Sequence, residues 1–180
     1  MIILSVLASS IDALLYGIGL GVSKITVTWK VALLTSLFPF SFALSSLKLG
    51  RYVSGSMSEA TQEGIAVLIY LVLAVYMYFE QRGREYKEGN WIDLDQDQRI
   101  NGRESLLLAL SLSVDTWIIA LPLGMIDVPE LFVAFLFGFM NFILLYLGNR
   151  ISSTMVRKIS RSWMSLSWIL FILLSLLHSF

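Results

Sequence analysis

The sequence predicts an all-α, polytopic membrane protein with six transmembrane helices arranged as a 3+3 inverted-topology repeat. Hydrophobic residues make up 57% of the chain and charged residues only 14%, a composition far from that of soluble domains. Six apolar stretches are each long enough to cross a bilayer core about 30 Å thick, which takes about 20 helical residues. Backbone groups find no water in lipid, so these stretches must form helices.

The predicted spans can be given in chain order. They run from about Ile2 to Val22, Val31 to Gly50, Ala60 to Phe79, Ser105 to Gly124, Glu130 to Gly148 and Trp163 to Phe180. Pro39 and Pro122 fall inside the second and fourth spans, where each removes a backbone donor. The first span lacks a basic leading region and is interrupted by Asp12, which favours a retained span over a cleaved signal peptide. We therefore expect one transmembrane domain, 1–180, with repeat 1 at about 1–79, an acidic loop at about 80–104 and repeat 2 at about 105–180.

An internal repeat links the first and fourth spans. Ser10-Ile11-Asp12 resembles Ser113-Val114-Asp115, and a glycine follows nine residues after each aspartate. A weaker echo closes the second and fifth spans, where Lys48-Leu49-Gly50-Arg51 resembles Leu147-Gly148-Asn149-Arg150.

The basic residues predict the orientation. With six spans, one side of the membrane receives eleven of the thirteen Lys and Arg residues, and the other side receives only Lys48 and Arg51. The positive-inside bias makes the first side cytoplasmic, so the acidic loop is cytoplasmic and both termini lie outside. The two halves then run in opposite senses, an arrangement typical of secondary transporters whose ion sites lie at the midplane.

Two intramembrane aspartates are the candidate ion ligands. An ionised Asp at a bilayer centre costs about 2.5 to 3.5 kcal/mol, so such residues usually mark an ion or proton path. No Lys or Arg lies within the spans near Asp12 or Asp115, which leaves protonation or a bound cation to neutralise them. Hydroxyl oxygens around them could complete a metal site, from Ser9, Ser10, Ser111 and Ser113. The alternative is a structural hydrogen bond to Ser9, Ser111 or Thr116.

The loop before the fourth span carries a calcium-like spacing. Oxygen ligands fall at positions 1, 3, 5, 9 and 12 of an EF-hand-like loop, with a backbone carbonyl at position 7. The candidate ligands are Asp93, Asp95, Asp97, Arg99, Asn101 and Glu104. Gln98 stands where such loops carry Gly. The alternative is a solvated loop in which Glu104 stabilises the N-terminus of the fourth helix through its dipole.

These elements together resemble the bacterial manganese efflux pump (MntP) family, and more closely its sporulation membrane protein (YtaF) branch. The branch carries a similar acidic segment followed by an A-L-S-[LV]-D core, matched here by Asp93, Asp95, Asp97, Ile100 and Glu104 and then by 109–115. The resemblance implies cation transport, with Asp12 and Asp115 as acids on the metal path and Asn141 as a further polar residue. Manganese exporters of the family resemble one another in having another acid on the second helix, which here reads Leu37-Phe38-Pro39-Phe40-Ser41.

The sequence thus predicts a multi-pass transporter that is embedded in the lipid bilayer of the bacterial inner membrane. We expect it to export a divalent cation, manganese or calcium. We expect no enzymatic activity, because the G-x-G-D motif of membrane aspartyl proteases does not accompany Asp115. We expect no nucleic-acid partner, because basic stripes interleaved with aromatic residues are absent. Nothing in the sequence indicates the oligomeric state. The alternative function is a non-transporting, sporulation-type membrane protein with a calcium-responsive cytoplasmic loop.

Overall fold

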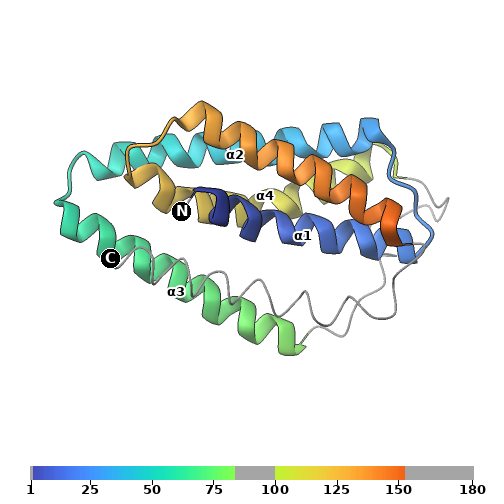
Figure 1. The fold of residues 1–180 in the computed structure, drawn as a ribbon, viewed down its shortest axis with the longest axis horizontal. Helices are drawn as coiled ribbons and strands as arrows, with labels where there is room; N and C mark the ends of the chain where they lie inside the picture. The colour runs from blue at the N-terminus through green and yellow to red at the C-terminus, as the bar shows by residue number, and fades with distance from the viewer. Residues whose placement is uncertain (1, 84–99, 153–180) are drawn as a thin grey trace.

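A computed structural model describes residues 2–83 and 100–152, which form five helices (Figure 1). They are α1 (Ile2–Val22), α2 (Trp29–Ser54), α3 (Glu59–Gly83), α4 (Gly102–Met125) and a fifth helix, Glu130–Ser152. At a rise of about 1.5 Å per residue, even α1 is about 32 Å long, enough to cross a bilayer core.

The first five predicted spans are confirmed as helices, and most of them extend beyond their predicted ends. α1 has the predicted bounds, whereas α2 begins at Trp29 and ends at Ser54. The earlier start of α2 has a local cause: the Thr28 side chain caps the helix by accepting a hydrogen bond from Val31 N. Thr28 precedes the apolar stretch on which the prediction was based. Pro39 and Pro122 do lie within helices. The predicted sixth span, 163–180, lies outside the described residues.

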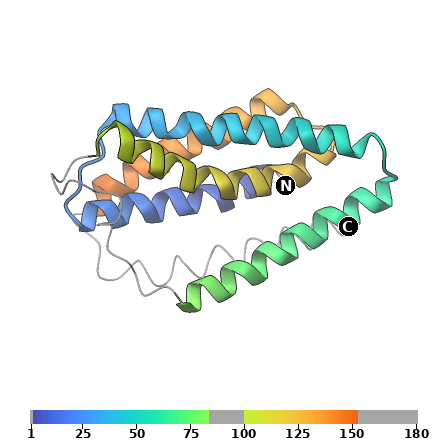
Figure 2. The same ribbon diagram turned by 180° about the vertical axis from the view of Figure 1, so that it is seen from behind.

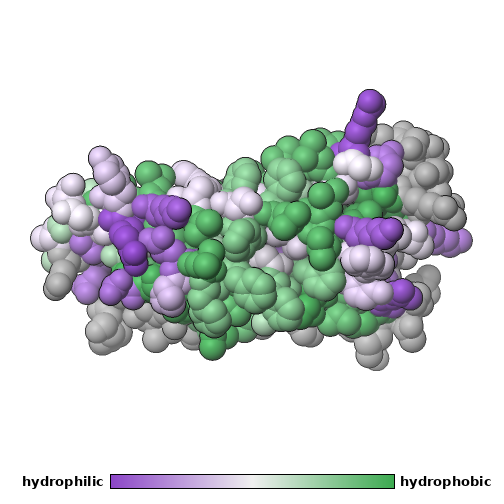
Figure 3. Space-filling view, turned by 90° about the horizontal axis from the view of Figure 1, so that it is seen from above, coloured by the Kyte–Doolittle hydropathy of each residue, from purple (hydrophilic) through white to green (hydrophobic). Residues whose placement is uncertain are grey.

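Four of these helices have the length and hydropathy of membrane spans: α1, α2, α4 and the fifth helix. α3 contributes a shorter apolar stretch, Ala60–Tyr76. Seen from above, hydrophobic residues form a band across the middle of the molecule, and hydrophilic residues gather towards its two ends (Figure 3). This distribution is that of a helical protein embedded in lipid.

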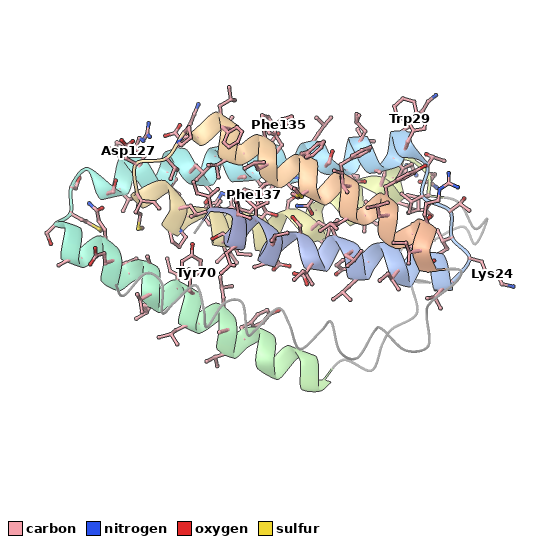
Figure 4. All side chains as sticks on the ribbon, viewed as in Figure 1. Lys24, Trp29, Tyr70, Asp127, Phe135 and Phe137 are labelled. Carbon is pink, nitrogen blue, oxygen red and sulfur yellow. The ribbon has the colours of Figure 1, made fainter. Side chains whose placement is uncertain are left out.

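The four long spans pack as a square. α1 lies against α4, α4 against α2, α2 against the fifth helix, and the fifth helix against α1. α3 lies outside the square on the side of α1 and α4, and it diverges from them towards Gly83 (Figures 1 and 2). Tyr70 reaches from α3 towards the bundle (Figure 4), where its buried hydroxyl approaches that of Ser5 on α1.

Glycines bring α1 and the fifth helix into backbone contact. A Cβ added to Gly17 would collide with the carbonyl oxygen of Leu145, and one added to Gly148 would lie 2.5 Å from the carbonyl oxygen of Leu14. Each glycine therefore faces the carbonyl of the residue three positions before the other glycine. Small residues that allow such close approach are typical of helix pairs in membranes.

The crossing of α2 and α4 is built in the same way. A Cβ on Gly124 would collide with the carbonyl oxygen of Leu47, and one on Gly50 with that of Leu121. Here too each glycine faces the residue three positions before its partner. The first crossing lies near the C-terminal end of the fifth helix and the second near the C-terminal end of α2, so the two lie towards opposite ends of the square.

The loops that join the helices are fixed by caps. α1 ends in a Schellman motif, in which Ile25 N donates to Leu20 O over 2.9 Å and Lys24 N donates to Gly21 O over 3.1 Å. Lys24 adopts a left-handed φ of 62° there, a position that usually takes glycine. Ile25, which follows it, is buried against Leu20 in one apolar cluster.

The hydrophobic core is divided into two clusters along the length of the square. The first cluster includes Ala8, Leu47, Ile119 and Phe137, with the Tyr70 side chain. The second contains Ala13, Leu20, Leu112 and Leu145, with the buried loop residues Ile25 and Val27. Most of the candidate ligands lie between the two clusters, on α1, α4 and the fifth helix.

Candidate ion site at mid-span

A layer of polar side chains separates the two apolar clusters at the middle of the spans. Residue 12 is the midpoint of α1, residue 141 is the midpoint of the fifth helix, and residue 115 lies within two residues of the midpoint of α4. The buried polar residues of this layer are Ser9, Ser10, Ser113, Thr116 and Asn141. Burying so many polar groups between apolar clusters is costly unless each is satisfied or serves a ligand.

The layer is fixed by a contact between α1 and α4. Ser9 Oγ lies 3.0 Å from Thr116 Oγ1, and both side chains are buried. Thr116 Oγ1 also lies 3.0 Å from Leu112 O, to which it can donate when Ser9 donates the bond between the helices. This bond sets the relative height of the two aspartate-bearing helices.

Helix geometry brings Asp12 and Asp115 to similar heights. Asp12 lies three residues after Ser9, about 4.5 Å along α1, and Asp115 lies one residue before Thr116, about 1.5 Å along α4. α1 and α4 run antiparallel (Figure 1), so both displacements point to the same end of the bundle and the two residues differ by about 3 Å in height. Both side chains are half-buried, and Asp12 Oδ2 is itself a buried atom.

The same geometry turns both aspartates towards the α3 side of the square. Asp12 lies seven residues, or two turns, after Ser5, whose hydroxyl approaches α3. Asp115 lies two residues after Ser113 and therefore on the opposite face of α4 from it. Ser111, one turn before Asp115, shares its face and donates to the carbonyls of its own helix, at Leu107 and Leu108.

Ser10 and Ser113 lie on the other flank, inside the square. Ser10 is seven residues before Gly17, which contacts the fifth helix, and Ser113 is eleven residues before Gly124, which contacts α2; both spacings place residues on one helix face. Each serine is fully buried and donates to the carbonyl four residues earlier, over 2.7 Å from Ser10 and 2.6 Å from Ser113. Their hydroxyl oxygens can still accept a hydrogen bond or bind a cation, but they face away from the aspartates.

Asn141 belongs to this inner group. It lies seven residues before Gly148, on the face of the fifth helix that meets α1. Its Nδ2 donates to Phe137 O over 2.9 Å, whereas its buried Oδ1 has no hydrogen-bond partner among residues 2–83 and 100–152. The predicted ligand set is thus divided into an outer group of Asp12, Asp115, Ser9 and Ser111 and an inner group of Ser10, Ser113 and Asn141.

Within residues 2–83 and 100–152, no cluster of three or more acidic, His or Cys side chains could hold a metal ion. A cation at mid-span would therefore rest on the two carboxylates and on neutral oxygens. Hydroxyl and carboxylate oxygens suit hard cations such as Mg²⁺, Ca²⁺ and Mn²⁺.

The acidic loop is described only at its end. Asn101 and Glu104 form a capping box: Asn101 Oδ1 accepts from Glu104 N over 3.1 Å, and Glu104 Oε2 accepts from Asn101 N over 2.9 Å. Glu104 thus has a local capping role at the start of α4, and the predicted calcium site stays a prediction. The other calcium-loop residues, Asp93, Asp95, Asp97 and Arg99, lie outside the described residues.

Two polar residues at the ends of the square were not singled out by the sequence. Arg51 at the end of α2 contacts the loop between α4 and the fifth helix, and Asn149 near the end of the fifth helix contacts the loop between α1 and α2. The only sequence signal was that each directly follows an echoed glycine, Gly50 or Gly148.

Comparison with known proteins gives one finding. A family model described as "Mntp: Putative manganese efflux pump" matches residues 37–177. No curated protein and no solved structure matches the chain.

Proposed function

Since the match covers well over half of its length, the chain belongs to the manganese efflux pump family, and we propose that it exports a divalent cation, with manganese as the first candidate. Its long apolar helices make it a multi-pass membrane protein. By the positive-inside bias, its Asn149 end faces the cytoplasm and its Arg51 end faces outside. The acidic segment before α4 favours the YtaF branch of the family as the finer assignment.

The observation that carries the proposal is the pair of acids at one height and on one flank. Asp12 and Asp115 lie on antiparallel helices held together by the Ser9–Thr116 bond at the middle of the membrane. Two carboxylates there repel each other and are costly to desolvate, whereas one divalent cation neutralises both. We place the cation between them, with hydroxyl oxygens of Ser9 and Ser111 as neutral ligands.

This arrangement gives a transport mechanism. Without the cation, at least one carboxyl carries a proton, and cation entry from the cytoplasm displaces it. Release on the other side permits reprotonation. Rocking of repeat 1 against repeat 2 about the site would expose it to each side in turn, as expected for an inverted repeat.

The test is cation flux in proteoliposomes that contain the purified full-length protein. Asp12→Asn and Asp115→Asn keep the size of the side chain but remove its charge, so each should abolish manganese flux while the helical content is retained. Parental flux of manganese, calcium, magnesium and zinc in both variants would refute the ion site.

A matched pair of serine variants tests the flank. Ser111→Ala and Ser113→Ala each remove a hydroxyl that donates within α4, but only Ser111 shares the face of Asp115. We expect Ser111→Ala to raise the half-saturating manganese concentration about tenfold, which corresponds to about 1.4 kcal/mol. Ser113→Ala should leave it unchanged, and the reverse result would place the cation inside the square.

A further inference from the structure

We propose that Arg51 and Asn149 are gate residues that lock the two halves of the protein at opposite ends, one by charge and the other by neutral hydrogen bonds. The inference rests on the proposed transport cycle, but its test measures accessibility and needs no cation flux. Each residue belongs to one half and binds a loop of the other half, so rocking of the halves must break one of these contacts at a time.

The Arg51 clamp joins α2 of repeat 1 to the 126–129 loop and the start of the fifth helix in repeat 2. The Arg51 guanidinium donates to Asp127 Oδ1 over 3.1 Å and to Val128 O over 3.1 Å. Its Nε also pairs with Glu130 Oε1 over 3.0 Å. Asp127 is fully exposed, whereas the Glu130 side chain is only 16% exposed. The clamp is therefore a charge network that salt screens in part.

The Asn149 clamp joins the fifth helix of repeat 2 to the 23–28 loop of repeat 1. Asn149 Oδ1 accepts from Val27 N over 3.0 Å, and its Nδ2 donates to Ile25 O over 2.9 Å and towards Gly17 O over 3.5 Å. One amide thus satisfies a donor and an acceptor of the same loop. No formal charge takes part, so we expect little dependence on salt.

Both clamps have the same position relative to the glycine crossings. Arg51 directly follows Gly50, which crosses α4, and Asn149 directly follows Gly148, which crosses α1. At each end, a close crossing and a clamp therefore hold together a helix of one half and an element of the other. Both clamps are formed at once in this structure, as expected of an occluded state between the two open states.

Two buried alanines can report the opening of each end. Ala120 lies one turn before Gly124 and Ala13 one turn before Gly17, and both are 0% exposed. The chain has no cysteine, so Ala120→Cys and Ala13→Cys would each give a single reactive thiol. Each protein is reconstituted into vesicles and treated with a membrane-impermeant thiol reagent from either side.

The Arg51 arm has a charge-dependent expectation. Arg51→Gln should raise the labelling rate of Ala120→Cys about threefold to fivefold from the Arg51 side and leave that of Ala13→Cys unchanged. Raising salt from about 0.05 M to about 0.5 M should also raise the labelling rate of Ala120→Cys when Arg51 is present. Arg51→Lys keeps the charge but loses the planar guanidinium group, so its labelling rate should lie between those of the parent and Arg51→Gln. Lys48→Gln removes the same charge from an exposed site one turn earlier and should have no effect.

The Asn149 arm has the opposite pattern. Asn149→Asp keeps the acceptor for Val27 N but sets an oxygen against Ile25 O, so Ala13→Cys should react about threefold to tenfold faster from the Asn149 side. In the parent, where Asn149 carries no formal charge, raising salt should leave the labelling rate of Ala13→Cys unchanged. Arg150→Gln is the control, because Arg150 bonds Tyr146 of its own helix. Unchanged labelling in both arms, or an equal rise at both reporters, would overturn the gates. If labelling shifts as expected but Asp12→Asn still transports, the gates stand and the proposed ion site fails.

Discussion

Replacing Gly124 by alanine should destabilise the bundle by forcing α2 and α4 apart. The added Cβ would lie 2.7 Å from Leu47 Cα and 2.8 Å from Leu47 C, and closer still to the Leu47 carbonyl oxygen. Ordinary van der Waals separation begins near 3.4 Å, so the distance to the Leu47 α-carbon alone is about 0.7 Å too short. All three atoms belong to the backbone, so no side-chain rotation can relieve the collision.

The magnitude follows from a matched comparison with Gly64→Ala. Gly64 lies in α3, and an added Cβ there would meet none of the described residues within 4 Å, so alanine brings only its better helix propensity, about 1 kcal/mol. That gain is common to both variants, and overpacking costs about 1 to 3 kcal/mol. The free energy of unfolding should therefore be about 2 kcal/mol lower for Gly124→Ala than for Gly64→Ala.

The assay is equilibrium unfolding of the purified protein by SDS in mixed micelles, followed by far-UV circular dichroism. A double variant that adds Leu47→Ala should not recover the loss, because the collision involves the Leu47 backbone. If Gly124→Ala is as stable as Gly64→Ala, the close crossing of α2 and α4 does not exist in the folded protein.

Two further predictions concern the caps and use the same unfolding assay. Lys24→Gly should stabilise the protein by about 1 kcal/mol because glycine adopts the left-handed φ of 62° without strain, and Lys24→Ala should not. Asn101→Ala should cost about 1 kcal/mol by removing the cap of α4, whereas Asn101→Asp should retain the cap. If millimolar calcium stabilises the parent protein and Asp93→Asn abolishes this effect, the loop binds an ion in addition to capping α4. If the unfolding curves with and without calcium are identical, Asn101 and Glu104 are capping residues only.

Hydropathy predicted the helices well because a membrane span must be both apolar and about 20 residues long. It could not predict where they end, since a cap such as Thr28 or Asn101 prolongs a helix into polar sequence. The apolar count for the second span stopped at Gly50, but backbone hydrogen bonds continue to Ser54.

The heights of the candidate ligands were also predictable, because Asp12 and Asp115 stand near the middle of their spans. The predicted ligand set joined Ser10 to Asp12, although a spacing of two residues puts them on opposite faces of one helix. Spacing could not say which face meets which neighbour, because that depends on the close crossings of Gly17 and Gly124. The sequence could not predict the Asn149 contacts for another reason: their partners are backbone groups of a loop, which carry no residue-specific signal.

The repeated Ser-x-Asp element is explained by these two faces. A spacing of two residues directs the serine into the square and the aspartate to the α3 side. Inside the square both serines are fully buried, so each hydroxyl must find a protein partner, which is the carbonyl four residues earlier on its own helix. Within the part of the chain that the structure describes, each serine thus fits beside a close helix contact without a hydrogen bond to another helix. The aspartates lie on the half-buried flank, which is where we propose that the cation binds.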